Sequence, residues 1–142
     1  MIKSFRGQIE DGEIETIRLS TNNGLKGYRI VKLFIVGEDP ASTTAEFTVK
    51  VFTVKPGSAT AEINFNDPTL LGMAYLDQNN GSNYQPQPLI VFDNMTFNQD
   101  IYITNVESAS DNKVNYYLEL EQVKLDLNEA TVATLKDMRG SQ

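Results

Sequence analysis

The amino-acid sequence predicts an all-β protein: an antiparallel β-sandwich of jelly-roll type, with about eight strands and one short C-terminal α-helix. Segments rich in Ile, Val, Phe, Tyr and Thr recur along the chain and are separated by turn signals such as Asn22-Asn23-Gly24 and Pro56-Gly57. Helical periodicity is found only near the C-terminus. A chain of 142 residues fits one domain, 1–142, and a domain of that size buries about 70% of the surface that its unfolded chain exposes.

The expected strands follow one another through most of the chain. Their ranges are 14–19, 28–36, 47–54, 61–65, 69–76, 89–92, 101–104 and 116–127. The segment 69–76 could also be a helix, because a short apolar run is ambiguous by periodicity alone, and strand is the preferred interpretation. For the segment from Met1 to Arg6 two alternatives stay open: a strand of a sheet, or an arm that reaches a neighbouring subunit.

Two of these strands carry an expectation about burial. The segment 28–36 is apolar on both faces toward its end, which predicts a central strand packed on two sides. In the segment 47–54 the apolar residues alternate with polar ones, so Thr48 and Lys50 are expected to face water. The residues expected to face the core are Phe47, Val49 and Val51.

The closing strand changes its apolar phase. Its apolar residues lie at even positions as far as Leu120 and at odd positions from Val123 onward. A period of two cannot keep one face buried across such a switch unless a bulge adds a residue or the strand crosses to the other sheet. We expect one of these two irregularities near Glu121-Gln122.

The helix is expected at about 127–139. Asp126 and Glu129 have the spacing of a capping box, and Asn128 is the alternative cap. A helix this short needs a surface to lie on. We expect its apolar stripe either to close the sandwich or to fasten one subunit to the next. The stripe consists of Leu127, Ala130, Thr131, Thr134, Leu135 and Met138.

The composition excludes several kinds of chemistry. The chain has no His, Cys or Trp, which removes the commonest general base, the commonest transition-metal ligands and the usual partners of an activated serine. With 12 basic and 19 acidic residues the net charge is -7, which disfavours a nucleic-acid partner. The longest apolar runs, such as Leu33 to Val36, are too short to span a membrane, and no signal-peptide pattern precedes Glu10. We expect a soluble protein that is not an enzyme and needs neither metal nor cofactor.

Two acidic patterns could be interpreted as sites. Glu119 and Glu121 lie two apart on one strand face, and paired carboxylates can bind a cation or act as acid and base. A solvated strand face, or a charged edge that prevents aggregation, is the favoured interpretation. Asp77-x-Asn79-x-Gly81 has a partial likeness to a calcium loop, but its glycine is one place early and Pro88 stands where a glutamate should close the loop. An ordinary asparagine-rich loop is favoured.

The long polar loop from Asp77 to Pro88 is predicted to face a partner. Tyr117 is a further candidate, because Tyr116-Tyr117 places one ring on each face of its strand and an exposed tyrosine can anchor a partner. The predicted partner-contact residues are Asn79, Tyr84, Pro86, Pro88 and Tyr117.

Three runs of the sequence resemble short virion proteins from tailed phages of marine bacteria. These runs are Ile17–Gly24 with Gly27–Lys32, Phe92–Asn94 with Phe97–Ile103, and Asn115–Gln122 continued by Leu127–Asp137. The resemblance covers most of the chain and is weakest in the middle loop. It implies a component of the phage particle that is made in the bacterial cytoplasm, and it supplies no catalytic residues.

Within a phage particle, the first hypothesis is a capsid decoration or cement protein. Such a protein would be a homotrimer that binds the major capsid protein on the outer shell. The alternatives are a receptor-engaging module of a fibre or tail, with the loop from Asp77 to Pro88 facing the host, and a head–tail connector or neck component. A polysaccharide hydrolase comes last, because the carboxylates are not visibly arranged for that reaction.

Overall fold

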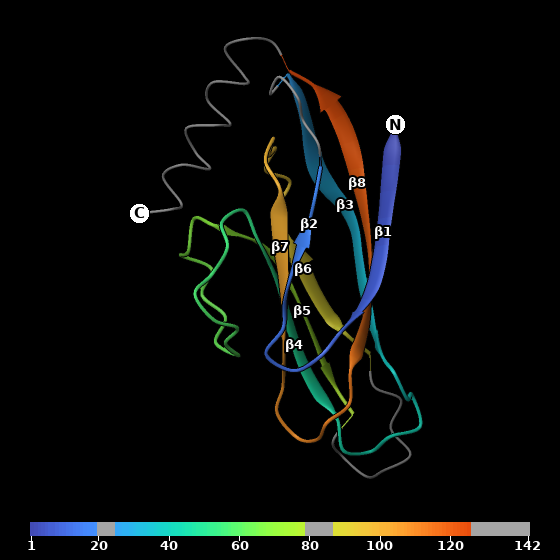
Figure 1. Cartoon of the computed structure of the whole chain (residues 1–142). Coiled ribbons are helices and arrows are strands. Elements are labelled where there is room, and N and C mark those ends of the chain that lie inside the picture. Colours follow the sequence, from blue (N-terminus) through green and yellow to red (C-terminus); the bar gives the residue numbers. More distant parts are fainter. Residues whose placement is uncertain (20–24, 79–86, 126–142) are drawn as a thin grey trace.

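The computed structural model of the protein describes residues 1–19, 25–78 and 87–125. These residues form two antiparallel sheets (Figure 1), which confirms the all-β fold class. The predicted helix at 127–139 lies outside the described residues. The strands are β1 (Ile2–Ile9), β2 (Ile14–Ile17), β3 (Lys26–Gly37), β4 (Glu46–Phe52), β5 (Leu70–Asp77), β6 (Leu89–Phe92), β7 (Ile101–Glu107) and β8 (Val114–Lys124).

The strand order is β1-β8-β3 in one sheet and β2-β7-β4-β5-β6 in the other. A jelly roll folds one long antiparallel hairpin, so that its strands become neighbours in the pairs 1–8, 2–7, 3–6 and 4–5. Here β1–β8, β2–β7 and β4–β5 are hydrogen-bonded pairs, whereas β6 pairs with β5. Within the described residues, three of the four jelly-roll pairs are therefore present. The pair of strands 3 and 6 is missing among these residues, because β6 pairs with β5 instead.

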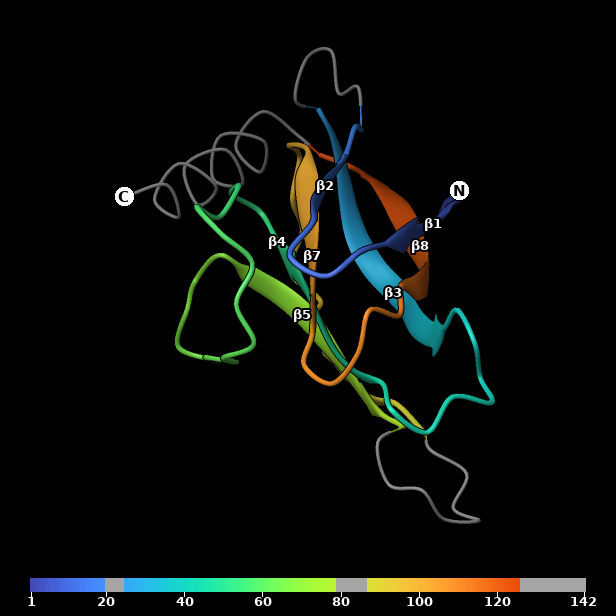
Figure 2. The same cartoon turned by 60° about the horizontal axis from the view of Figure 1, so that its bottom comes forward.

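One apolar core lies between the two sheets. The inner faces of both sheets contribute to it, and Phe47, Val49 and Val51 are buried there as predicted. Figure 2 shows the two sheets packed face to face. Removing these side chains from water is the main force that holds the sheets together. The largest fully buried side chains are Tyr28, Phe47, Phe97, Ile9, Ile35, Leu71, Ile101, Ile103, Leu118, Leu120, Val49 and Val51.

The set of strands differs from the predicted one at two places. The N-terminal segment is a sheet strand, because β1 pairs with β8 from Ile2 to Ile9. The strand predicted at 61–65 is wrong: these residues form no strand, and Ile63 and Phe65 are exposed. The alternation of apolar residues in this segment was a correct observation, but β4 already has β5 and β7 as neighbours, so the segment has no free sheet edge there to pair with.

The prediction that 28–36 is a central strand is also wrong, since β3 is at the edge of its sheet. The register with β8 shifts between Ile30 and Lys32, so the buried phase changes from Tyr28 and Ile30 to Leu33 and Ile35. This bulge explains part of the two-faced apolar pattern. It does not explain Phe34 and Val36, which point outward and are exposed.

On β4, Thr48 and Lys50 are buried rather than exposed to water. They do lie on the outer face, as the alternation predicts. The chain between β4 and β5 folds back over that face, on the side away from β1, β8 and β3 (Figures 1 and 2). The sequence expectation failed because a long connection, rather than a strand, covers this part of the sheet.

The prediction of a bulge or a sheet crossing near Glu121-Gln122 of the closing strand is wrong. β8 runs without a break as the middle strand of its sheet, and the register shift belongs to β3, opposite Glu119 and Leu120. The pairing with β1 ends at Glu121. Beyond that point Leu125 packs in a small separate cluster with Leu25 and Val123, which explains the change of phase.

Candidate interaction surface

Two of the five predicted partner-contact residues lie within the described structure. Asn79, Tyr84 and Pro86 are outside it. Pro88 is half-buried immediately before β6, and Tyr117 is half-buried on the outer face of β8. They belong to one region: β3 pairs Phe34 with Tyr117, and Phe34 also lines a cleft with Pro88.

The cleft lies between the edge strands β3 and β6. We call the boundary between these two strands, from Tyr28 and Phe97 to Phe34 and Pro88, the seam. At one end the seam is closed, because Tyr28 and Phe97 exchange two backbone hydrogen bonds of 2.8 and 2.9 Å. At the other end it opens into a cleft of about 260 Å³. The walls of that cleft are mainly apolar, and they come from Phe34, Ile35, Val36, Pro40, Leu76, Gln78, Gln87 and Pro88.

Large apolar side chains are exposed around β6. Leu89 is 66% exposed and Val91 51%, and Phe65 from the connection between β4 and β5 is 68% exposed. Together with Phe92 these residues make up what we call the β6 patch. A second hollow, of about 300 Å³, lies between Phe65 and the end of β6 near Phe92. Grouped exposed apolar side chains of this size are typical of protein interaction sites.

Among the residues that the structure describes, one side of the β6 backbone pairs with no strand. Asp93 donates its N–H to Leu71, so Gly72 and Phe92 form a non-hydrogen-bonded pair of the antiparallel ladder. The N–H and C=O groups of Val91 therefore face β5, and those of Ile90 and Phe92 face away from it. An edge of this kind can accept a further strand.

β3 has the same property along the seam. Glu38 donates its N–H to Lys113, which makes Gly37 and Val114 a non-hydrogen-bonded pair. By alternation, the backbone groups of Leu33 and Ile35 point away from β8. Within the described residues, both strands that border the seam therefore turn backbone groups without a strand partner toward the seam.

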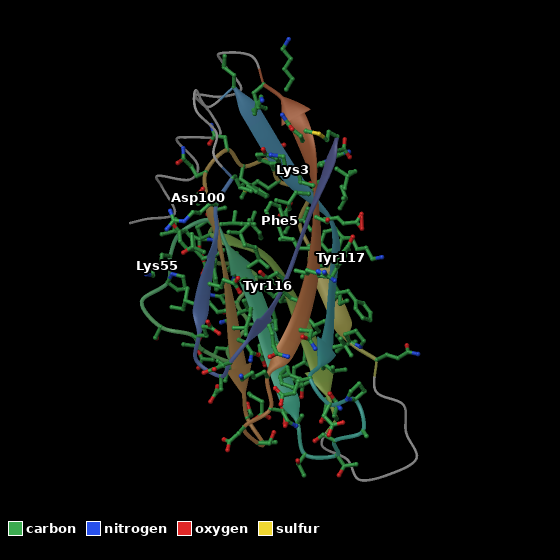
Figure 3. The ribbon with its side chains drawn as sticks, turned by 45° about the vertical axis from the view of Figure 1, so that its right-hand side comes forward. Lys3, Phe5, Lys55, Asp100, Tyr116 and Tyr117 are labelled. Carbon is green, nitrogen blue, oxygen red and sulfur yellow. The ribbon has the colours of Figure 1, made fainter. Side chains whose placement is uncertain are left out.

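Tyr117 lies in a shallow concavity of about 560 Å³ on the outer face of β1, β8 and β3. Figure 3 shows Tyr116 and Tyr117 leaving opposite faces of β8, and Tyr116 is the buried one of the two. The Lys32 Nζ atom is 5.6 Å from the centre of the Tyr117 ring, a cation–π distance. The polar side chains of the concavity are Arg6, Gln8 and Asn115.

The paired carboxylates Glu119 and Glu121 have a structural explanation. β8 is the middle strand of its sheet, so a protective role at an edge does not apply. Glu121 accepts a 3.0 Å hydrogen bond from Arg29, its register partner on β3. Both carboxylates are half-buried on the outer face, where cross-strand ion pairs of this kind contribute little stability.

Lys50 is the buried cation that the sequence did not reveal, with 4% of its surface exposed. Its Nζ donates hydrogen bonds to Thr60 Oγ1 at 2.9 Å and to the backbone O of Glu62 at 2.6 Å. Burial lowers the pKa of this ammonium group, and the carboxylates of Asp67 and Glu62 oppose that shift. These contacts hold the connection between β4 and β5 on the sheet and so position Phe65.

Glu15 and Tyr116 meet between the sheets beside β1 and β2. Burial raises the pKa of Glu15, the hydrogen bond with Tyr116 lowers it, and the charge of Glu13 raises it. The pKa of Tyr116 is raised too, first by burial and then by the charge and hydrogen bond of Glu15. Gly7 leaves room for this ring, since a Cβ there would lie 2.9 Å from Tyr116 Cε1. Glu15 is half-buried and Tyr116 is buried, and the pair lies away from the β6 patch.

The β6 patch was missed because its signal is ambiguous. Leu89–Phe92 is a run of four apolar residues, which in sequence looks like a strand buried on both faces. Only the strand order shows that this run is at an edge. Phe65 is the last residue of the strand predicted at 61–65 and is in phase with Ile63, so the sequence pattern does not indicate that its side chain is exposed.

Among the described residues, no cluster of three or more Asp or Glu side chains is arranged to hold a metal ion. The same residues include no helix long and apolar enough to cross a membrane. The sequence matches no protein-family model, and the comparison with curated proteins finds no match.

Proposed function

We propose that this protein is a structural component of a phage particle, a capsid decoration protein that binds the outer surface of the shell and stabilises it. The observation that carries the proposal is the β6 patch. Leu89 and Val91 on the edge strand and Phe65 beside it are mostly exposed, and an exposed apolar sheet edge tends to associate with a partner. Binding to a capsid shell would bury such a surface. The resemblance of its sequence to phage virion proteins supports the same role.

The β-sandwich suits this role physically. A decoration protein needs a rigid core, solubility before assembly and a contact surface, and a net charge of -7 favours solubility. In this proposal the protein is a homotrimer, and its partners are the major capsid protein or other virion proteins. It acts by binding, without a cofactor. Because a fold alone does not determine function, the β6 patch, rather than the sandwich, is what favours this role.

A receptor-engaging fibre or tail module is the second candidate, and the concavity around Tyr117 favours it. An aromatic ring flanked by Arg6, Gln8 and Asn115 offers both a stacking surface and hydrogen-bonding groups to a ligand. The two candidates differ in where the protein sits and in how many copies a particle carries.

Copy number separates the two candidates. Purified particles would be run on a gel, and the band of this protein compared with that of the major capsid protein. Decoration predicts hundreds of copies, because a shell repeats its subunits by symmetry, whereas fewer than about twenty would contradict it. Sedimentation of the isolated protein tests the trimer: a mass near 15.9 kDa, that of one chain, would contradict it.

A further inference from the structure

We infer that the shell partner binds as an added β-strand along the free side of β6, an inference that rests on the proposed function and specifies its contact. The occupant is an extended segment of the shell protein, apolar at alternate positions, with a basic residue at the end that lies beside Asp93. Adding a strand to a free sheet edge is a common way for a folded domain to bind an extended peptide.

The backbone determines what kind of partner fits. Ile90 and Phe92 direct their N–H and C=O groups away from β5, as the hydrogen bond from Asp93 to Leu71 requires. An extended chain satisfies such a row of alternating donors and acceptors. A helix does not, because its backbone groups bond within the helix. The unpaired row therefore favours an extended segment.

The side chains around β6 supply the pockets that an added strand needs. Successive residues of a strand point to opposite faces of the sheet. Beside β6 there is a hollow next to Phe65 and Val91, and near Pro88 the cleft bordered by Phe34 and Val36. The hollow and the cleft lie at opposite ends of β6. A strand paired with β6 passes both and can place an apolar side chain in each.

The charges around β6 indicate which charged residue the partner segment should carry, and at which end. Neither β6 nor the lining of the two hollows contains a Lys or Arg. Asp93 lines the first hollow, and the chain as a whole is acidic. A segment with a Lys or Arg beside Asp93 gains a charge pair there, whereas an acidic segment is repelled.

The edge that β6 offers is short, which limits how many hydrogen bonds a partner strand can form with it. β6 has four residues, and short edges of this kind resist uncontrolled association. Pro88 precedes it and lacks an N–H donor. An added strand can therefore form only a few hydrogen bonds, and the two hollows must supply the remaining affinity and the specificity.

The test uses empty, expanded shells prepared from the phage whose particles contain the chain. Leu89→Lys places a charge at the most exposed position of β6, and Thr16→Lys places the same charge on β2, the opposite edge of the same sheet. Binding of the wild type and both variants would be measured by co-sedimentation over a range of protein concentrations. Circular dichroism melting confirms that all three proteins are folded.

We expect Leu89→Lys to weaken shell binding at least tenfold and Thr16→Lys to change it less than twofold. Equal binding by the wild type and Leu89→Lys would overturn the strand-addition inference and leave the decoration role standing. Failure of the wild type itself to bind would overturn the decoration role and the inference with it. If Leu89→Lys were to melt early, Val91→Thr gives the same test without a charge.

Strand addition is further separated from side-chain docking by a synthetic peptide. The probe is an acetylated, amidated decamer of alternating Val and Thr that ends in Lys, together with two versions N-methylated at alternate residues. Only the version methylated on the amides that face β6 should lose binding, which is followed by the NMR shifts of Ile90 and Phe92. Equal binding by both methylated versions, or loss in neither, would contradict a backbone ladder. Concentration-dependent shifts without peptide would mean that a second copy of the chain occupies the edge, which overturns the proposed occupant.

Discussion

The two edge strands of the five-stranded sheet, β2 and β6, differ in their charges and in the exposure of their apolar side chains. Both edge strands have four residues. On β2, Ile14 and Thr16 are half-buried, and the charged residues Glu13, Glu15 and Arg18 lie in or beside the strand. On β6, Leu89 and Val91 are exposed, the strand itself carries no charge, and Asp93 follows it directly. Charges next to an edge discourage a further strand, so the comparison marks β6 as the edge kept available for a partner.

The seam between β3 and β6 shows the same contrast within a short distance. Its closed end is bridged by Tyr28 and Phe97, two fully buried rings whose centroids are 6.5 Å apart. Its open end leaves Phe34 and Val36 exposed beside Pro88. The bridge thus holds the chain that follows β6 against β3, and within the described residues no strand pairs with the outer side of β6.

The largest effect is expected from Phe97→Ala, which removes the buried ring at the closed end. The ring is fully buried, so the variant leaves a cavity and should lose about 3–5 kcal/mol of unfolding free energy. Urea denaturation measures the loss. A change below about 1 kcal/mol would mean that the seam is not closed by this ring.

Gly72→Val is expected to have the next largest effect, because the new side chain would disturb the packing of β5 against β6. A Cβ at position 72 would lie 2.8 Å from Phe92 Cβ and 3.0 Å from the backbone O of Val91. We expect destabilisation of about 1–3 kcal/mol, as in other overpacked sites. The matched control is Gly57→Val, since a Cβ at Gly57 meets nothing within 4 Å. Equal melting temperatures for the two variants would contradict the account of this contact.

The β2 edge is expected to show a pH dependence. Burial raises the pKa of Glu15 above its ordinary value of 4.5 in the folded state. The folded state therefore binds this proton more tightly, and the stability from this group is present below pH 4.5 and lost as pH rises through the folded pKa. Glu15→Gln cannot ionise. The stability of the wild type relative to this variant should fall from about pH 4 to about pH 7, as measured by urea midpoints, whereas a constant difference would refute the assignment.

The smallest expected effect on stability is that of Leu89→Lys. The side chain is mostly exposed, so the free energy of unfolding should change by less than about 0.5 kcal/mol. Thermal melting of this variant beside Thr16→Lys makes the comparison. A loss of several kcal/mol for Leu89→Lys would show that Leu89 belongs to the core and not to a contact surface.

Much of the fold follows from local patterns, and what does not follow depends on pairing partners. The turn signals and the period of two predict the strands around Val49, Ile103 and Leu118 well. They cannot tell that the alternating segment around Ile63 lies over a sheet and that β1 takes a place in one. Propensity describes a single strand, whereas the choice of neighbours is a tertiary property.

Only part of the candidate site could be predicted, because the rest of it also depends on tertiary contacts. Local features of the sequence predict Tyr117 and Pro88, and the structure adds Phe34, which pairs with Tyr117 and lines the cleft with Pro88. Lys50 could not be found, because its burial depends on a connection that reaches back to offer Thr60 and the backbone of Glu62. The availability of Leu89 depends on strand order, which the sequence does not contain.

The most direct test of the free β6 edge is amide hydrogen exchange along β6, with and without empty shells, read residue by residue. In the isolated protein, the amide of Val91, which is bonded to β5, should exchange slowly, and those of Ile90 and Phe92 should exchange fast. With shells bound, the account predicts that Ile90 and Phe92 become at least tenfold slower and that Thr16 on the opposite edge does not change. Unchanged exchange at Ile90 and Phe92 on shells that demonstrably carry the protein would contradict it.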